Sequence, residues 1–275
     1  MPTERHASAL GTWELAHAAP HPALRGHVLR YCGYAEDTAR PLRRREVASS
    51  DVTLIFSFGP PIEIDGARFR SFVAGVDEGY TDTEHAGHQR GLEVKLSPLA
   101  VRPLLGVAPA ELTGRVVDVE ALLGRPGAEL CERLAEAPGW EARFALLDRV
   151  LARRLGPDAR PPGDMVHAWN RLLAADGGIP VAALASELGW SRRHFGARFL
   201  EHVGLAPKAA ARLLRFRRAV ALLERDDGAR LAEIAQACGY YDQAHLNRDF
   251  RAYAGRSPGE HLGRRLPDGG GVRAT

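Results

Sequence analysis

The side chains best suited to molecular recognition lie on one predicted helix near the C-terminus. At about 100° per residue, the apolar Leu246, Phe250 and Tyr253 of this helix face inward. The outward side then carries polar and basic residues, namely Gln243, His245, Asn247, Arg248 and Arg251. Gln and Asn amides pair with adenine edges, and Arg clamps guanine O6 and N7, although Arg251 can equally hold a phosphate. The face therefore predicts DNA major-groove reading, with an ordinary solvated helix face as the alternative.

A second predicted helix, earlier in the chain, carries a related but poorer face. Phe195 and Phe199 face inward, and three residues that can contact a polyanion begin the outward side: Arg192, Arg193 and His194. The face continues with residues that cannot form bidentate bonds to a base, namely Gly196, Ala197 and Leu200. Arg198 flanks the inward side and can extend its side chain to a phosphate. Lys208 begins the next predicted helix, whose free N–H groups can also bind phosphate.

These two helices belong to an internal repeat. The segment 181–189 aligns with 231–239 at an offset of 50, and after one extra residue in the turn the offset is 51. Each copy predicts a short helix, a turn that contains glycine, and a second helix that ends near Gly204 or Gly255. Between the copies, residues 207–224 predict one long helix. The pattern is typical of two helix-turn-helix units, and a six-helix domain without a nucleic-acid role is the alternative.

Two segments carry a resemblance to a known family. Gly239-Tyr-Tyr-Asp-Gln-Ala-His-Leu-Asn-Arg-Asp-Phe250, followed by Gly255-Arg-Ser-Pro258, resembles the second DNA-binding half of AraC/XylS transcription regulators. Leu188-Gly-Trp-Ser-Arg-Arg-His-Phe195 and Gly204-Leu-Ala-Pro-Lys208 resemble the first half. The resemblance covers about residues 164–265 and implies operator binding. The chain departs from the family at Ala197 and Leu200, where members often carry polar or basic side chains.

The chain as a whole predicts an α+β protein of two domains. Residues 1–155 are expected to form a β-rich N-terminal domain with a helical extension, in which strands fill about 25–96 and helices follow Ser97. Residues 156–163, rich in Pro and Gly, are the expected linker. Residues 164–265 should form an all-α domain of two helix-turn-helix units joined by the long helix. Residues 266–275 are expected to be a flexible tail.

Composition and charge limit the classes of protein that fit. Of 275 residues, 45% are hydrophobic and 26% charged, as in ordinary globular proteins. Residues 164–265 carry 16 Lys and Arg against 11 Asp and Glu, whereas 1–163 carry 20 against 22, so positive charge gathers in the C-terminal part. No apolar run or signal peptide predicts a membrane span or export. Three distant cysteines, Cys32, Cys131 and Cys238, fit a reducing cytoplasm.

The remaining reactive residues give weaker predictions. His85 and His88, near Asp82 and Glu84, offer metal ligands, but such a cluster is more often plain polar surface. Cys32 beside Tyr31 could be an alkyl-accepting thiol, as in some relatives of the family, but a packed cysteine is the favoured interpretation. No phosphate loop, nucleophile elbow or carboxylate pair stands in a catalytic context. We therefore expect no enzyme activity, catalytic residue, cofactor or metal.

These observations predict a cytoplasmic, sequence-specific, DNA-binding transcription regulator. Its expected partners are double-stranded operator DNA, RNA polymerase, a small-molecule effector of the N-terminal domain and a second copy of the chain. One alternative is a barrel-type enzyme, or a cysteine alkyl acceptor, fused to a DNA-binding module. Another is an architectural DNA-binding protein that lacks a ligand.

Overall fold

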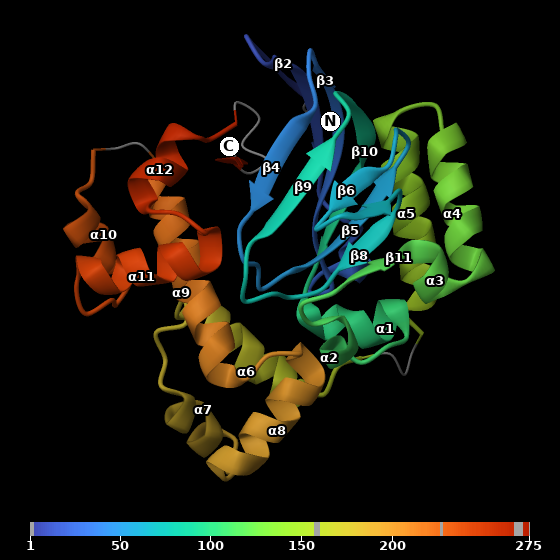
Figure 1. Ribbon diagram of the computed structural model, residues 1–275. Coiled ribbons are helices and arrows are strands. Elements are labelled where there is room, and N and C mark those ends of the chain that lie inside the picture. The colour runs from blue at the N-terminus through green and yellow to red at the C-terminus, as the bar shows by residue number, and fades with distance from the viewer. Residues whose placement is uncertain (1–2, 157–159, 226–227, 267–271, 275) are drawn as a thin grey trace.

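The N-terminal part folds as two antiparallel β-sheets. A computed structural model describes residues 3–156, 160–225, 228–266 and 272–274 (Figure 1). Sheet A has the order β1-β2-β3-β10-β5-β8-β11, and sheet B has the order β12-β4-β9-β6-β7. The bounds in sheet A are β1 Thr3–Ser8, β2 Gly11–Ala18, β3 Val28–Thr38, β5 Val52–Ser57, β8 Phe72–Ala74, β10 His88–Leu96 and β11 Val116–Asp118. In sheet B they are β4 Leu42–Glu46, β6 Ile62–Ile64, β7 Ala67–Phe69, β9 Thr81–His85 and β12 Val272–Arg273.

Alternating burial explains the strands. In β5, the side chains of Val52, Leu54 and Phe56 are buried while their neighbours are half-buried, so one face of the strand lines the core. The strands extend beyond the predicted range at both ends. They begin at Thr3 rather than near residue 25, and β11 lies in the zone expected to be helical. The three residues of β11 are half-buried, so they show no alternation of buried and exposed side chains that would have predicted a strand. They form a strand because they pair with β8.

Helices follow the sheets, as predicted after Ser97. They are α1 Val101–Leu105, α2 Pro109–Leu112, α3 Val119–Leu123, α4 Arg125–Glu136 and α5 Trp140–Arg154, with 3-10 turns at Pro22–Leu24 and Pro98–Ala100. Contacts of α5 fix this layer to sheet A. The ring of Phe144 stacks on Tyr31 with 5.7 Å between centroids, and the Tyr31 hydroxyl donates a hydrogen bond to Asp148 at 3.0 Å. The Trp140 indole N–H donates to Glu14 at 3.0 Å, which lowers the pKa of that carboxyl.

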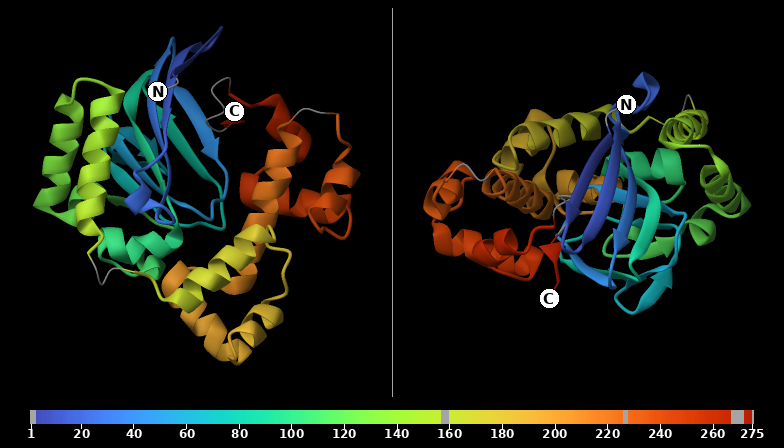
Figure 2. Two further views of the ribbon diagram at one scale, coloured as in Figure 1. Left: turned by 180° about the vertical axis from the view of Figure 1, so that it is seen from behind. Right: turned by 90° about the horizontal axis from the view of Figure 1, so that it is seen from above.

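The C-terminal part is helical, so the predicted α+β class is confirmed. Its helices are α6 Gly163–Ala174, α7 Val181–Glu187, α8 Arg192–Val203, α9 Pro207–Leu223, α10 Leu231–Ala237, α11 Gln243–Ala254 and α12 Pro258–Gly263. The two β-sheets lie between the C-terminal helices α6–α12 and the helices α3–α5 (Figure 1, Figure 2). Buried side chains of both parts, among them Phe56 and Phe216, join one hydrophobic cluster. In the described part of the chain, no helix is both long and apolar enough to cross a membrane.

The segments expected to be linker and tail are described only in part. In the expected linker, residues 157–159 lie outside the described residues, and α6 already begins at Gly163. In the expected tail, 267–271 and 275 lie outside them. The expectation of a flexible tail is wrong for Val272 and Arg273, which form β12 against β4. Hydrogen bonds to a distant strand edge order these two residues, and their own sequence carries no sign of that partner.

A buried charge cluster holds β4 against sheet A. The Arg44 guanidinium donates a 2.6 Å hydrogen bond to the Glu36 carboxylate on β3, and His85 Nε2 of β9 lies 3.2 Å from the same oxygen. All three side chains are buried. Burial alone raises the pKa of Glu36, but the close approach of His85 and the charge of Arg44 outweigh it, so the pKa lies below its ordinary value. The folded state therefore favours ionised Glu36.

We predict that Glu36→Gln destabilises the chain by about 3–5 kcal/mol, because it removes the charge of a buried carboxylate that both Arg44 and His85 contact. The stabilisation from ionised Glu36 is fully present above its ordinary pKa of 4.5 and is lost as the pH falls through the lower folded-state value. Urea unfolding of both proteins from neutral to acid pH measures this.

Glu63→Gln is the matched control, because the Glu63 carboxylate lies half-exposed, 3.7 Å from Arg68. Removing a surface ion pair of this kind should cost about 0–1 kcal/mol. A Glu36→Gln protein as stable as the control would contradict the role of the cluster.

Candidate nucleic-acid interface

The predicted repeat is present as two equivalent helix-turn-helix units. Helices α7 and α8 form the first unit, and α10 and α11 form the second. The first residues of α7 and α10 are Val181 and Leu231, and those of α8 and α11 are Arg192 and Gln243, which reproduces both offsets of the sequence alignment. Glycines with left-handed backbone make the two turns, with φ of 68° at Gly189 and 71° at Gly239.

The same local interactions start α8 and α11. The Ser191 hydroxyl accepts a hydrogen bond from the backbone N–H of His194 at 3.2 Å, and the Asp242 carboxylate accepts one from His245 at 2.7 Å. These side chains cap the first turn of each helix, where backbone N–H groups otherwise lack partners. The caps fix the N-terminal turn that carries Arg192 in the first unit and Gln243 in the second.

Aromatic packing sets which face of each helix is outward. Five predicted inward residues are buried, which confirms the assignment: Phe195, Phe199, Leu246, Phe250 and Tyr253. Phe216 of α9 packs against Phe250 and Tyr253 with ring centroids 5.0 and 5.2 Å apart. On the back of α11, Asp249 is only 2% exposed and accepts a 3.0 Å hydrogen bond from Arg212 of α9, which raises the pKa of that guanidinium. The second unit is therefore held to α9 by both apolar and ionic contacts.

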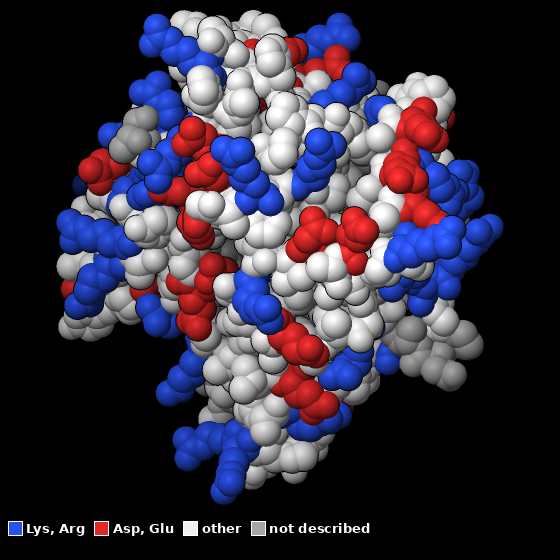
Figure 3. Space-filling model, turned by 45° about the vertical axis from the view of Figure 1, so that its right-hand side comes forward, with Lys and Arg blue, Asp and Glu red and all other residues white. Residues whose placement is uncertain are grey.

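The predicted site residues divide into exposed and half-buried groups. Those with exposed side chains are Arg192, Arg193, His194, Lys208, Gln243, Arg248 and Arg251. The half-buried ones are Arg198, His245 and Asn247. Figure 3 shows Lys and Arg projecting at the lower tip of the molecule, which α7 and α8 form. The exposed predicted residues thus lie on the N-terminal turn of α8, at the start of α9 (Lys208) and along the outer side of α11.

Contacts explain the half-buried positions. The His245 ring meets the edge of Tyr240 with 5.1 Å between centroids, as the His194 ring meets Trp190 at 4.7 Å in the first unit. Asn247 lies on the flank of α11, with its side-chain oxygen buried and lacking a partner among the described residues. Arg198 donates a 2.8 Å hydrogen bond to Glu201 one turn later.

Pairing distinguishes the cations of the recognition helices from those of α9. In α9, Arg212 pairs with Asp249, Arg217 lies 3.8 Å from Asp51, and Arg218 lies 3.3 Å from Asp176. Within the described ranges, four arginine side chains of α8 and α11 have no hydrogen-bond or ion-pair partner, namely Arg192, Arg193, Arg248 and Arg251. Unpaired exposed guanidinium groups are available to phosphates and base edges without first breaking a protein contact.

Sequence reasoning missed Tyr241, the extra residue in the second turn. Trp190 and Tyr240 are equivalent, because their backbone N–H groups donate 2.9 Å hydrogen bonds to the matching carbonyls of Ala185 and Ala235. The next structural match is between the N-caps Ser191 and Asp242, so Tyr241 is the insertion. Its side chain is 93% exposed, beside the first turn of α11. The change of offset in the repeat was the signal that could have identified it.

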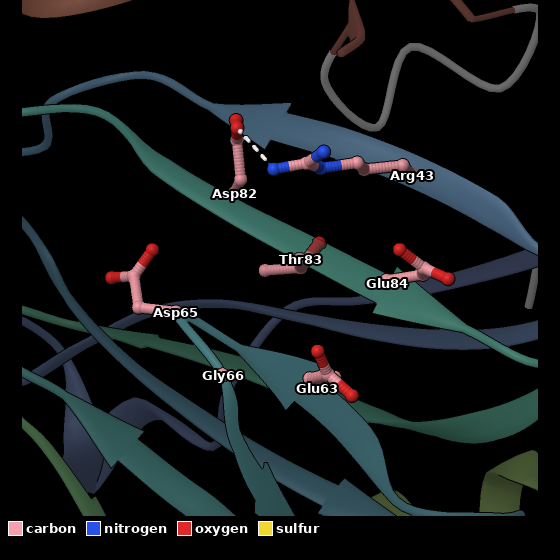
Figure 4. A pocket seen from close by; sticks show the side chains of 7 residues that line it. All are labelled: Arg43, Glu63, Asp65, Gly66, Asp82, Thr83 and Glu84. Atoms are coloured by element: carbon pink, nitrogen blue, oxygen red, sulfur yellow. Dashed lines mark hydrogen bonds and ion pairs between the residues drawn. The ribbon is translucent and has the colours of Figure 1, made fainter. Parts of the chain in front are cut away.

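The candidate metal ligands and thiols lie apart from this interface. The His85 side chain is buried beside Glu36, whereas His88 Nδ1 lies 2.5 Å from Asp37 on the surface. No group of three or more His, Cys, Asp or Glu in the described residues could hold a metal ion. The outer face of sheet B has a hollow of about 270 Å³, lined by Arg43, Glu63, Asp65, Gly66, Asp82, Thr83 and Glu84 (Figure 4). Cys32 is half-buried on β3.

A comparison with known protein families identifies a helix-turn-helix domain in the part of the chain that contains the repeat. Residues 184–264 match a helix-turn-helix domain family, and residues 16–118 match a domain of unknown function (DUF6597). No curated protein matches the chain.

Three solved structures illustrate what this chain is similar to. The DNA-binding domain of AdpA in complex with a target DNA is 28% identical over 37% of this chain and 92% of that one, with a TM-score of 0.35. ToxT from Vibrio cholerae is 11% identical over 84% of this chain and 97% of that one, with a TM-score of 0.48. A DNA-binding transcriptional dual regulator from Escherichia coli is 22% identical over 37% and 91%, with a TM-score of 0.33.

The family match falls on the two units that the geometry defines, and it spans α8 and α11 completely. Residues 184–264 therefore form a helix-turn-helix DNA-binding domain of the AraC type at the C-terminal end of the chain.

Proposed function

We propose that the protein recognises one operator sequence by placing α8 and α11 in successive major-groove segments of double-stranded DNA. Two repeated units with exposed, unpaired arginines on equivalent helices carry this proposal. Helix-turn-helix proteins read bases from the N-terminal part of the second helix, and successive major-groove segments on one DNA face are about 34 Å apart. The family match to residues 184–264 supports the assignment.

The residues take different roles in this proposal. On α11, Gln243 and Arg248 read base edges, and Arg251 holds a phosphate. Asn247 can donate to a base edge only through its side-chain NH2, because its side-chain oxygen is buried. His245 contributes from the edge of this face, because Tyr240 holds its ring. On the first unit, Arg192, Arg193 and His194 contact the DNA at the first turn of α8. Arg198 and Lys208 reach phosphates, since the surface ion pair of Arg198 with Glu201 is weak enough to exchange.

We further propose that the N-terminal domain regulates DNA binding, and that no reaction is catalysed. A small-molecule effector or a homodimer is the expected input, and RNA polymerase is the expected partner of the DNA-bound protein. Strand β1 supports a role in dimer formation, because it forms an edge of sheet A and most of its residues are exposed. We expect the protein to act in the cytoplasm.

The two recognition helices should contribute unequally to specificity. Arg248→Ala should cost about 1–3 kcal/mol of binding free energy on the best duplex and relax the base preference beneath α11, as for a lost bidentate contact. Arg192→Ala should weaken all duplexes more evenly, as for a lost phosphate contact. Binding of both variants to one library of duplexes, selected first with the unaltered chain, measures the difference. Equal loss of base preference from both substitutions would refute the asymmetry.

Phosphate contacts should appear in the salt dependence. Because each neutralised phosphate releases counterions, Arg251→Ala should reduce the slope of log affinity against log salt by about one, whereas the paired Arg218→Ala should leave it unchanged. Titrations at several salt concentrations give the slopes. An unchanged slope for Arg251→Ala would remove that residue from the phosphate contacts.

Tyr241 should be a DNA contact of the second unit. Tyr241→Ala should weaken binding to the selected duplex about tenfold while leaving the unfolding midpoint unchanged, because the 93% exposed ring makes few contacts in the protein. Leu29→Ala on β3, which removes a 44% exposed side chain outside both recognition helices, is the comparison for loss of an exposed apolar group. Full affinity in the Tyr241→Ala protein would show that the inserted residue is only surface.

A further inference from the structure

Both recognition helices end at a glycine that the N-terminal domain contacts. The carbonyl of Gly204, after α8, accepts a 2.8 Å hydrogen bond from the Thr113 hydroxyl. The carbonyl of Gly255, after α11, accepts a 3.4 Å hydrogen bond from Arg45 on β4. The two glycines are equivalent positions of the repeat, since each is the C-cap of its recognition helix. One domain therefore contacts both units at the same point of each unit.

The absence of a side chain at these glycines permits the close approach. A Cβ on Gly204 would lie 2.7 Å from the Thr113 hydroxyl, and one on Gly255 would lie 2.6 Å from both Arg45 and the Tyr80 ring. Both positions also have left-handed backbone, with φ of 83° and 65°. Gly189 and Gly239 share that conformation, but a Cβ there would meet nothing within 4 Å. The turn glycines are required for backbone conformation alone, and the helix-end glycines for conformation and contact.

Several interactions hold the contact at Gly255 in place. The Arg45 guanidinium donates 2.7 and 2.8 Å hydrogen bonds to Asp82 and lies 4.1 Å from the centroid of the Tyr80 ring. The hydrogen bond from Arg45 lowers the pKa of Asp82, so the pair is charged at neutral pH. The backbone N–H of Ala48 donates a 2.9 Å hydrogen bond to the carbonyl of Tyr253 in the last turn of α11.

The C-terminal strand adds a further connection to the second unit. Strand β12 pairs with β4, and Arg256, which directly follows Gly255, donates a 2.9 Å hydrogen bond to the carbonyl of Arg273 in β12. On the side of the first unit, α2 packs along α8 and leads directly into Thr113. Sheet B and the α1–α2 region thus lie beside the second and first units respectively (Figure 1).

The two units are consequently connected twice. Helix α9, a single helix of 17 residues, joins them along the chain, and the N-terminal domain joins them through space. A closed ring of this kind restrains the relative position of α8 and α11 more than α9 alone can.

We propose that Thr113 and Arg45 are positioning residues that fix the distance and angle between α8 and α11, so that the N-terminal domain sets the half-site spacing the protein accepts. The inference rests on the proposed function, since it concerns how the two helices meet DNA. Neither residue touches DNA in this proposal. A change in the N-terminal domain that moves β4 or α2 would act on operator choice by the same route.

Half-site spacing tests the proposal with the full chain. A duplex selected from random DNA by the unaltered protein is remade with one base pair inserted or deleted between the half-sites, which shifts one half-site by roughly 3.4 Å and turns it by about 35°. The unaltered protein should lose at least about tenfold in affinity. The variants Thr113→Val and Arg45→Ala, and the two combined, should lose less than about threefold on the same change.

Matched controls separate positioning from general damage. Arg43→Ala removes another arginine that pairs with Asp82, at 3.2 Å, and Arg43 makes no hydrogen bond to Gly255 in the described part of the chain. Gly239→Ala and Gly189→Ala impose the same left-handed strain as Gly255→Ala and Gly204→Ala without the clash. Gly204→Ala and Gly255→Ala should broaden the range of half-site spacings that the protein accepts. Arg43→Ala, Gly189→Ala and Gly239→Ala should keep the narrow spacing preference of the unaltered chain.

A second measurement needs no DNA. Spin labels on Cys introduced at Ala197 of α8 and the exposed Ala244 of α11, with the three native cysteines replaced by alanine, report the distance between the helices. The distance distribution should broaden in the combined Thr113→Val, Arg45→Ala protein. Unchanged distributions or unchanged spacing dependence would show that α9 alone fixes the two units and would overturn the inference. Failure of the unaltered chain to select any duplex would instead contradict the proposed function, and the label distances would still decide this inference.

Discussion

The burial of one aromatic stripe on each recognition helix determines most of the proposed interface. The core of the C-terminal part buries Phe195 and Phe199 of α8 and Leu246 and Phe250 of α11. Once these positions of a helix are buried, its geometry determines which residues face outward. The arginines on the outer side need no local partner to hold them in place, because the buried stripe already orients the helix. The same constraint excludes Asp249 from DNA, since its carboxylate lies on the buried side and binds Arg212.

The parts of the fold that depend on local pattern could be predicted from the sequence. Helix period, capping residues and turn glycines are each encoded within a few residues. The repeat shows the same pattern twice, so each copy supports the helix-turn-helix assignment of the other. The repeat located both recognition helices and their inward residues. The offset between the two copies changes from 50 to 51 in the turn, and this change marks Tyr241 as an inserted residue.

Features fixed by distant partners could not be predicted in this way. Val272 and Arg273 form a strand only because the edge of β4 is next to them, and β11 exists only because β8 offers hydrogen bonds. The half-buried state of Asn247 depends on how closely α11 packs against its neighbours, which a 100° helical projection does not contain. The contacts of Thr113 and Arg45 join residues 91 and 210 positions apart, and no local pattern marks such pairs.

The two ends of each recognition helix make different kinds of contact, and the proposed positioning by the N-terminal domain depends on this difference. A helix N-terminus carries a partial positive charge that favours anions, which suits the exposed turn at Arg192 to a phosphate backbone. A helix C-terminus presents carbonyls that need donors, and Thr113 and Arg45 supply them from the other domain. Since a helix is stiff over its length, a displacement at its C-terminal carbonyl is carried to its N-terminal turn. Control of α8 and α11 therefore does not require the N-terminal domain to approach the DNA.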